Sequence, residues 1–168
     1  RYRVNADASE AERRNWLQLP STYNPRTLQL ADEIRSRSGS DADRVRTTLE
    51  YLRRGGYEYT LSPPRLGQNS IDEFLFDTRQ GYCEHYASAF VFLMRALDVP
   101  ARVVTGYQGG ELNPVDGFLT IRQSDAHAWS EVWLQGRGWV RVDPTAIVAP
   151  MRIDQGAREI ARQSGIAL

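Results

Sequence analysis

Cys83 is the only cysteine among the 168 residues, and its surroundings suit a nucleophile. It lies where a loop containing Gly81 meets an apolar segment that we predict to be a helix, which places the thiol in the first helical turn. Backbone N–H groups there carry partial positive charge and favour thiolate over thiol. A buried structural cysteine is the alternative, but the tight turn and the helix start favour the nucleophile.

Two histidines are available as a general base, and the predicted elements distinguish them. His85 is two positions from Cys83 on the same helix, where side chains point to different sides, so we predict a structural role for it. His127 begins a predicted strand, and the ordinary pKa of histidine lies near neutrality. We expect a sheet packed against the helix to bring His127 to Cys83.

Asp143 ends the next predicted strand and completes a Cys-His-Asp set. If the intervening hairpin is short, His127 and Asp143 lie diagonally on one face of the sheet, within side-chain reach. Asp143 would then orient the imidazole and stabilise its charged form. The alternative is that Asp143 only begins a turn with Pro144. We therefore predict Cys83, His127 and Asp143 as the catalytic residues.

Acyl transfer also needs donors for the oxyanion of the tetrahedral intermediate. The backbone N–H of Cys83 is one, and the second is left open among three upstream side chains: Tyr59, Asn69 and Gln80. Three downstream tryptophans are expected to form core and the wall of a substrate groove: Trp129, Trp133 and Trp139.

The elements that position these residues change type once along the chain. Up to residue 97 the pattern is helical, with predicted helices over 28–38, 41–55, 71–76 (begun by a capping box from Ser70 to Glu73) and 83–97, and a short strand over 57–61. Four strands are predicted after that, over 101–107, 118–122, 126–134 and 139–143. Helices followed by an antiparallel meander give an α+β fold with a central nucleophile helix. We predict three parts: an extended lead-in over 1–27, a catalytic domain over 28–150 and a tail or linker over 151–168. The lead-in is expected to contain a short helix near 8–16 and to end at Asn24-Pro25.

Composition excludes several classes of function. The net charge of zero and the pI near 7 argue against a nucleic-acid partner. One cysteine excludes an internal disulfide, and with two histidines it leaves no ligand cluster for zinc, so no metal or cofactor is expected. No apolar run reaches 18 residues, and a chain that begins at Arg1 reads as part of a longer protein. All 21 basic residues are arginine, so this chain offers no lysine acceptor of its own.

Five short blocks together resemble the transglutaminase-like superfamily. They are Gly-Tyr-Cys-Glu-His-Tyr-Ala at 81–87, Pro-Ala-Arg-Val-Val-Thr-Gly-Tyr at 100–107, His-Ala-Trp-Ser-Glu-Val at 127–132, Gly-Trp-Val at 138–140 and Asp-Pro-Thr at 143–145. They follow the family's order and lie within residues 57–150, over half of the chain. The chain is especially similar to the bacterial membrane-anchored members of the transglutaminase protein A type.

The resemblance implies a papain-like fold in which Cys83 is the nucleophile, His127 the base and Asp143 the orienting group. It implies acyl transfer from a peptidyl glutamine donor to an amine acceptor or to water, in a periplasmic domain of an inner-membrane protein. Animal members carry an oxyanion-stabilising tryptophan upstream of the cysteine, whereas Trp16 is the only upstream tryptophan here. The matched blocks contain no calcium-ligand signature.

Two other functions stay open at this point. The same three residues would serve a cysteine peptidase or amidase that hydrolyses peptide or peptidoglycan bonds. A non-catalytic binding module is the third possibility, although such modules have often lost one of the three residues.

Overall fold

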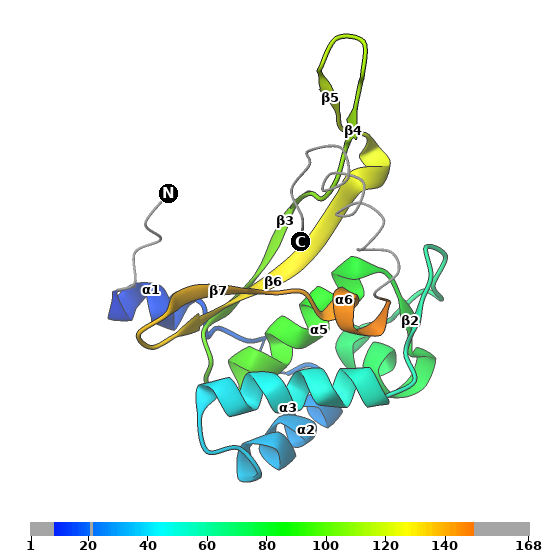
Figure 1. Ribbon diagram of the computed structural model, residues 1–168. Helices are drawn as coiled ribbons and strands as arrows, with labels where there is room; N and C mark the ends of the chain where they lie inside the picture. The colour runs from blue at the N-terminus through cyan, green and yellow to red at the C-terminus, as the bar shows by residue number, and fades with distance from the viewer. Residues whose placement is uncertain (1–8, 21, 150–168) are drawn as a thin grey trace.

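The computed structural model describes residues 9–20 and 22–149 and contains a central helix between a sheet and two further helices (Figure 1). The sheet has the antiparallel order β3-β6-β7, formed by Ala101–Tyr107, Ala126–Leu134 and Gly138–Val142. The central helix is α5, Cys83–Ala96, and α2 (Pro25–Ser36) and α3 (Asp41–Arg54) contact it as well. The predicted α+β class and the central position of the nucleophile helix are confirmed.

Helix α5 is buried on nearly all sides, as its apolar composition predicted. Six of its side chains are completely buried: Tyr86, Ala87, Ala89, Phe90, Leu93 and Met94. On β6, alternate side chains face the helix, and Ala128, Ser130 and Val132 are buried there. The Ser130 hydroxyl donates to the Ala87 carbonyl at 3.3 Å and ties the strand to the helix. This contact between β6 and the start of α5 fixes the position of the Cys83 side chain.

The strand predicted over 118–122 does not join the sheet, so the four-stranded meander is wrong. Instead β5 (Leu119–Thr120) pairs with β4 (Glu111–Leu112), which lies between the strands predicted over 101–107 and 118–122. The two strands form an arm that projects beyond β3 and β6 (Figure 1). Gly109 and Gly110 have φ angles of 106° and 146°, and these conformations turn the chain away from the sheet after β3. Apolar side chains of the arm consequently remain exposed, Val115 at 91% and Phe118 at 73%.

The helix starts also differ from the predictions. Helix α2 begins at Pro25, three residues earlier than predicted, so Asn24-Pro25 starts a helix and does not end the lead-in. The cause is the Asp72 carboxylate, which accepts the N–H groups of Arg26 and Thr27. The capping box at Ser70 is wrong, since the Glu73 carboxylate accepts the Gly67 N–H at 2.6 Å instead. Helix α4, Ser70–Asp72, continues as a π-helical turn over Glu73–Thr78.

Four short elements complete the fold. Helix α1, Glu10–Asn15, lies where the short lead-in helix was predicted. Strand β1 (Glu58–Tyr59) pairs in parallel with β2 (Gln80–Gly81), directly before Cys83. Helix α6, Pro144–Val148, follows β7. The predicted tail over 151–168 lies outside the described residues. None of the helices described is long and apolar enough to cross a membrane.

Candidate active site

The structure brings Cys83, His127 and Asp143 together in one hydrogen-bonded array. The His127 Nε2 atom lies 2.7 Å from Asp143 Oδ2. Because Nε2 is engaged by the carboxylate, Nδ1 is the ring nitrogen left for the hydrogen bond between His127 and the Cys83 thiol. All three side chains are largely buried, so these bonds lie away from bulk water.

The β6–β7 hairpin explains how His127 reaches Asp143. Leu134 pairs with Gly138 and Ser130 with Val142, so the turn between the strands is short. Counted from the Ser130 pair, the position opposite His127 would be residue 145, and Asp143 lies two residues from it on the same face. The 2.7 Å bond confirms the predicted diagonal arrangement.

The electrostatics of the array favour a thiolate–imidazolium pair. Burial raises the pKa of the Cys83 thiol, but hydrogen bonds from His127 and from the backbone N–H of Ala128 outweigh burial and bring the pKa below its ordinary value. Burial lowers the pKa of His127, but hydrogen bonds with Asp143 and Cys83 raise this pKa to about 9. Opposite shifts of the two groups are what an activated thiol requires.

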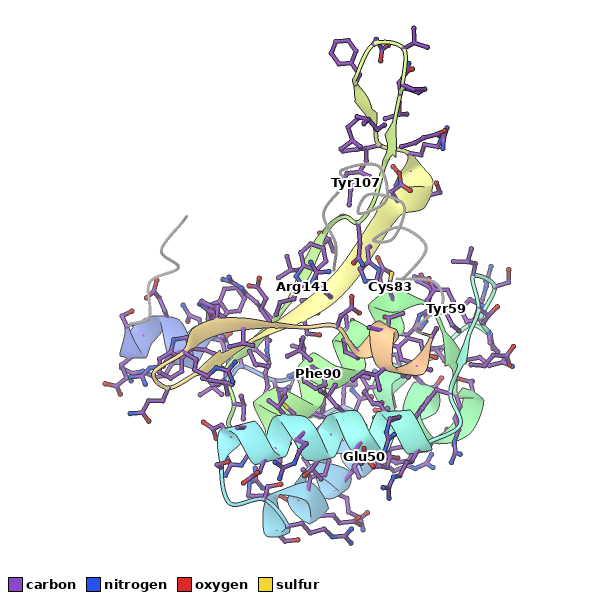
Figure 2. The ribbon with its side chains drawn as sticks, in the orientation of Figure 1. Glu50, Tyr59, Cys83, Phe90, Tyr107 and Arg141 are labelled. Atoms are coloured by element: carbon purple, nitrogen blue, oxygen red, sulfur yellow. The ribbon has the colours of Figure 1, made fainter. Side chains whose placement is uncertain are left out.

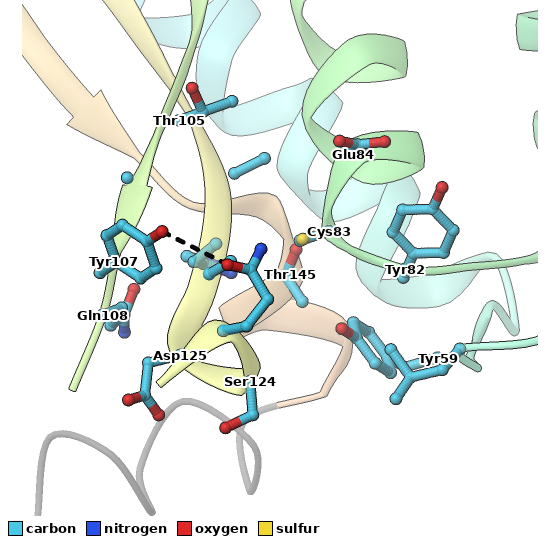
Figure 3. Close-up of a pocket in the computed structure, with 16 residues that line it drawn as sticks. Tyr59, Tyr82, Cys83, Glu84, Thr105, Tyr107, Gln108, Ser124, Asp125 and Thr145 are labelled. Carbon is cyan, nitrogen blue, oxygen red and sulfur yellow. Dashed lines mark hydrogen bonds between the residues drawn. The ribbon is translucent and has the colours of Figure 1, made fainter. Parts of the chain in front are cut away.

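A cleft of about 950 Å³ opens over Cys83 and His127. Figure 3 shows its lining, in which aromatic walls come from three tyrosines, Tyr59, Tyr82 and Tyr107. Tyr59 lies beside the start of α5, and Tyr107 stands at the foot of the arm (Figure 2). The prediction that tryptophans form the groove wall is therefore wrong.

The tryptophans lie on the outer face of the sheet, where arginines cover several of them. The Arg102 guanidinium lies 4.1 Å from the Trp139 ring centre and 5.5 Å from that of Trp16, and it pairs with Glu131 at 2.7 Å. Trp16 is therefore part of this outer cluster and does not line the cleft. Trp139, Arg141 and Asp143 share one face of the strand predicted to end at Asp143, and the sequence assigned no role to Arg141.

His85 lies beside the array without joining it. Its Nδ1 accepts the Tyr82 N–H at 3.3 Å, and its ring packs on the rings of Tyr82 and Phe74, with centroid distances of 4.5 and 5.7 Å. Burial lowers the pKa of His85 below its ordinary value. These contacts agree with the structural role predicted for this histidine.

The three side chains considered as second oxyanion donor are now distinguishable. Asn69 accepts the Asn24 N–H at 2.8 Å and holds the start of α2, whereas Gln80 donates to the Glu58 carboxylate at 3.0 Å. Tyr59 is the one of the three that lines the cleft with Cys83. In the described part of the chain, no group of three or more His, Cys, Asp or Glu side chains is arranged to hold a metal ion.

Comparison with known proteins finds relatives over most of the chain. A protein of Pseudomonas aeruginosa named protein-glutamine gamma-glutamyltransferase is 47% identical over 166 residues, which are 94% of this chain and 25% of that protein. The uncharacterized protein YebA of Bacillus subtilis is 32% identical over 137 residues, 77% of this chain and 19% of that protein. This chain thus spans only a quarter or less of the length of these relatives.

Solved structures extend the likeness to the fold. The periplasmic domain of TgpA from Pseudomonas aeruginosa, bound to ethylmercury, has a TM-score of 0.87 at 48% identity and covers 90% of this chain and 54% of its own. A candidate cysteine protease from Cytophaga hutchinsonii has a TM-score of 0.61 at 26% identity, over 86% of this chain and 45% of its own. The family model described as the transglutaminase-like superfamily matches residues 28–144, and this chain belongs to that superfamily.

Proposed function

We propose that this chain is a catalytic domain that transfers the acyl group of a peptidyl glutamine, through a thioester on Cys83, to a primary amine. The observation that carries the proposal is the array in which His127 contacts both Cys83 and Asp143, with Cys83 and His127 lining the cleft. The relative named protein-glutamine gamma-glutamyltransferase, 47% identical to this chain, supports the choice of glutamine as donor.

In the first step the Cys83 thiolate attacks the side-chain amide carbon of the glutamine. The His127 imidazolium gives its proton to the departing nitrogen, ammonia leaves, and a thioester remains. In the second step the neutral imidazole takes a proton from the incoming amine, which attacks the thioester carbonyl. An isopeptide bond forms, and the thiol is released for the next cycle. Asp143 keeps the imidazole oriented throughout through its bond to Nε2.

The oxyanion of each tetrahedral intermediate lies near the start of α5. The first-turn N–H groups of a helix have no carbonyl partner in a preceding turn, so the Cys83 N–H serves as one donor. Tyr59 serves as the second, because it lines the same cleft and carries a hydroxyl that donates. Its strand is held beside α5 by the Tyr86 hydroxyl, which donates to the Glu58 carbonyl at 2.8 Å.

Charge at the cleft supports an amine as acceptor. Glu84 and Asp125 line it, and none of the described residues in its lining is an arginine. Two carboxylates in a lining whose described residues include no arginine attract a protonated amine to the mouth of the cleft. The acceptor is a lysine or other primary amine outside this chain, since this chain has no lysine.

Hydrolysis is the second candidate. The candidate cysteine protease from Cytophaga hutchinsonii shares the fold, and the same array would cleave an amide if water replaced the amine. Conversion of the donor's glutamine residue to a glutamate residue in the presence of excess amine would establish this alternative.

We further propose that the domain works in the periplasm on substrates of the cell envelope, as part of a protein anchored in the inner membrane. The periplasmic domain of TgpA, matched over 90% of this chain, supports that location.

The decisive experiment measures incorporation of a fluorescent primary amine into a glutamine-rich protein. We expect incorporation by the wild-type chain and none by Cys83→Ala. Alkylation of Cys83, the single thiol, faster than a free thiol at mildly acidic pH is the control that the wild-type site is formed. Incorporation that persists in Cys83→Ala would refute the proposal, and its absence in a wild-type chain whose thiol still reacts would refute amine transfer.

A further inference from the structure

We propose that Arg141 is a positioning residue for the active site: it holds the Asp143 carboxylate in place and limits how tightly that carboxylate retains the His127 proton. The inference deepens the proposed function, in which His127 must release this proton to the leaving nitrogen. It rests on three contacts of the Arg141 side chain at the outer face of the sheet, with Asp143, Gln108 and Trp129.

The first observation is that one carboxylate oxygen serves two cationic groups. Asp143 Oδ2 lies 2.7 Å from His127 Nε2 and 3.7 Å from Arg141 Nη2. The other oxygen, Oδ1, accepts the Thr145 N–H at 3.2 Å. The carboxylate is therefore held from three sides, and it shares its charge between the imidazolium and the guanidinium.

The second observation is that Arg141 is itself held in position. Its Nη2 donates to Gln108 Oε1 at 2.8 Å, and its guanidinium lies 4.3 Å from the centre of the Trp129 ring. The Trp129 ring in turn stacks on the His127 ring, with centroids 6.3 Å apart and planes 24° apart. A planar guanidinium suits this combination of stacking and hydrogen bonding better than an ammonium does.

The third observation is that Arg141 forms no ion pair with Glu131, the acidic residue opposite it. Glu131 lies directly opposite Arg141 in the β6–β7 register, yet its carboxylate pairs with Arg102 of β3 at 2.7 Å. Arg102 thereby satisfies the nearest acidic group, and the Arg141 side chain extends along the strand to Asp143. The pairing of Glu131 with Arg102 thus leaves a positive charge beside the active site.

The direction of the effect follows from Coulomb's law. A guanidinium next to the imidazolium disfavours the protonated ring, so Arg141 counteracts the rise that Asp143 produces in the pKa of His127. An imidazolium that is held less tightly is a better acid for the leaving nitrogen. Because the Arg141 side chain is 49% exposed and Asp143 only 12%, water screens the guanidinium in part, and the effect is modest.

Other ionisable groups that face the array are the same in all variants considered below. They lie on the cleft side and on the outer face of β6: Tyr59, Tyr82, Cys83, Glu84, Tyr107, Asp125 and Glu131. A change in the titration of His127 on substitution of Arg141 is therefore attributable to the guanidinium.

The experiment follows the titration of His127 by NMR in the chain without substrate. The chain has two histidines, so two imidazole signals are expected, and a His85→Asn variant assigns them. Arg141→Met removes the charge while keeping an unbranched side chain on Trp129, and Arg141→Lys keeps the charge. Arg26→Met is the matched control, because Arg26 is 51% exposed, lies 4.4 Å from the Phe76 ring centre and pairs with Asp77 at 2.8 Å, on helix α2.

We expect Arg141→Met to raise the midpoint of the His127 titration by roughly half a pH unit, and Arg141→Lys to return it most of the way to the wild-type value. Arg26→Met should leave it unchanged. An unchanged or lowered midpoint in a folded Arg141→Met chain would overturn the proposal, as would an equal shift in Arg26→Met. Since no turnover is measured, these outcomes are separate from those that test acyl transfer.

Discussion

The two faces of strand β6 have opposite characters although their residues alternate along one segment. The inner side chains, Ala128, Ser130 and Val132, are small or apolar and buried on α5. The outer side chains, His127, Trp129 and Glu131, are half-buried and lie among charged groups. The difference shows how one strand packs on the core with one face and carries a residue of the candidate site, His127, on the other.

The alternation also links the two faces, because successive side chains of a strand point to opposite sides. The inner face sets the depth at which β6 packs on the helix, and this brings the Ala128 N–H and His127 together at the Cys83 sulfur. Substitutions on the inner face should therefore change folding stability first, and those on the outer face should change the rate first.

The largest expected effect is on the outer face. His127→Ala removes the base that forms the thiolate and protonates the leaving group, so we expect kcat to fall about 10⁴-fold. The free energy of unfolding should change less than kcat does, because the His127 side chain lines the cleft and packs outside the apolar core. Steady-state amine incorporation and urea unfolding measure the two quantities, and equal loss of both would contradict the separation of the faces.

On the inner face, Val132→Ala should act in the opposite way. The side chain is completely buried, and removing two methyl groups should lower the free energy of unfolding by about 2–3 kcal/mol. At temperatures where the variant stays folded, kcat should remain within about threefold of wild type. A large loss of kcat in a fully folded Val132→Ala chain would show that the inner face also sets the chemistry.

Tyr59→Phe tests the cleft wall opposite the strand. If its hydroxyl donates to the oxyanion, removing it should lower kcat roughly tenfold, with little change in KM for the glutamine donor. The ring stays in place through its stacking on Tyr86, at a centroid distance of 6.4 Å. A change in KM alone would assign Tyr59 to substrate binding instead.

The pH dependence gives the smallest and most gradual effect. The reactive pair exists above the pKa of Cys83, which is lowered, and below the pKa of His127, about 9. We expect kcat/KM to fall as pH rises through about 9, because His127 then loses the proton that the leaving nitrogen needs. Iodoacetamide should alkylate Cys83 faster than a free thiol at mildly acidic pH. A rate profile with no alkaline decline would contradict this assignment of the proton.

The sequence correctly predicted the central helix and the hairpin between β6 and β7, because neighbouring residues alone determine both. The apolar residues of 83–97 surround a helix, which indicated a central position, and the structure confirms this. The short turn before Gly138 determined the strand register, and the register in turn placed Asp143 diagonally from His127. Local spacing sufficed because both residues lie on one hairpin.

Predictions that depended on the choice of a distant partner were less successful. Residues 118–122 have a strand pattern, but no local signal shows that they pair with β4 instead of the sheet. The three tryptophans alternate on β6 and β7 as expected, yet the face that they share covers the sheet's outer side rather than the cleft. Asn24 and Asp72 are separated by 48 residues, yet each accepts backbone N–H groups at the start of the other's helix. Neither segment alone shows that these bonds form.

The sequence by itself therefore determined the candidate residues, their order and the elements that carry them, since helix starts and hairpin registers are set by neighbouring residues. Only the tertiary structure decided which aromatic rings line the cleft, which upstream side chain faces the thiol, and which carboxylate each arginine takes. Those choices depend on side chains that meet across three strands and a helix, where several partners of similar chemistry compete and packing selects one.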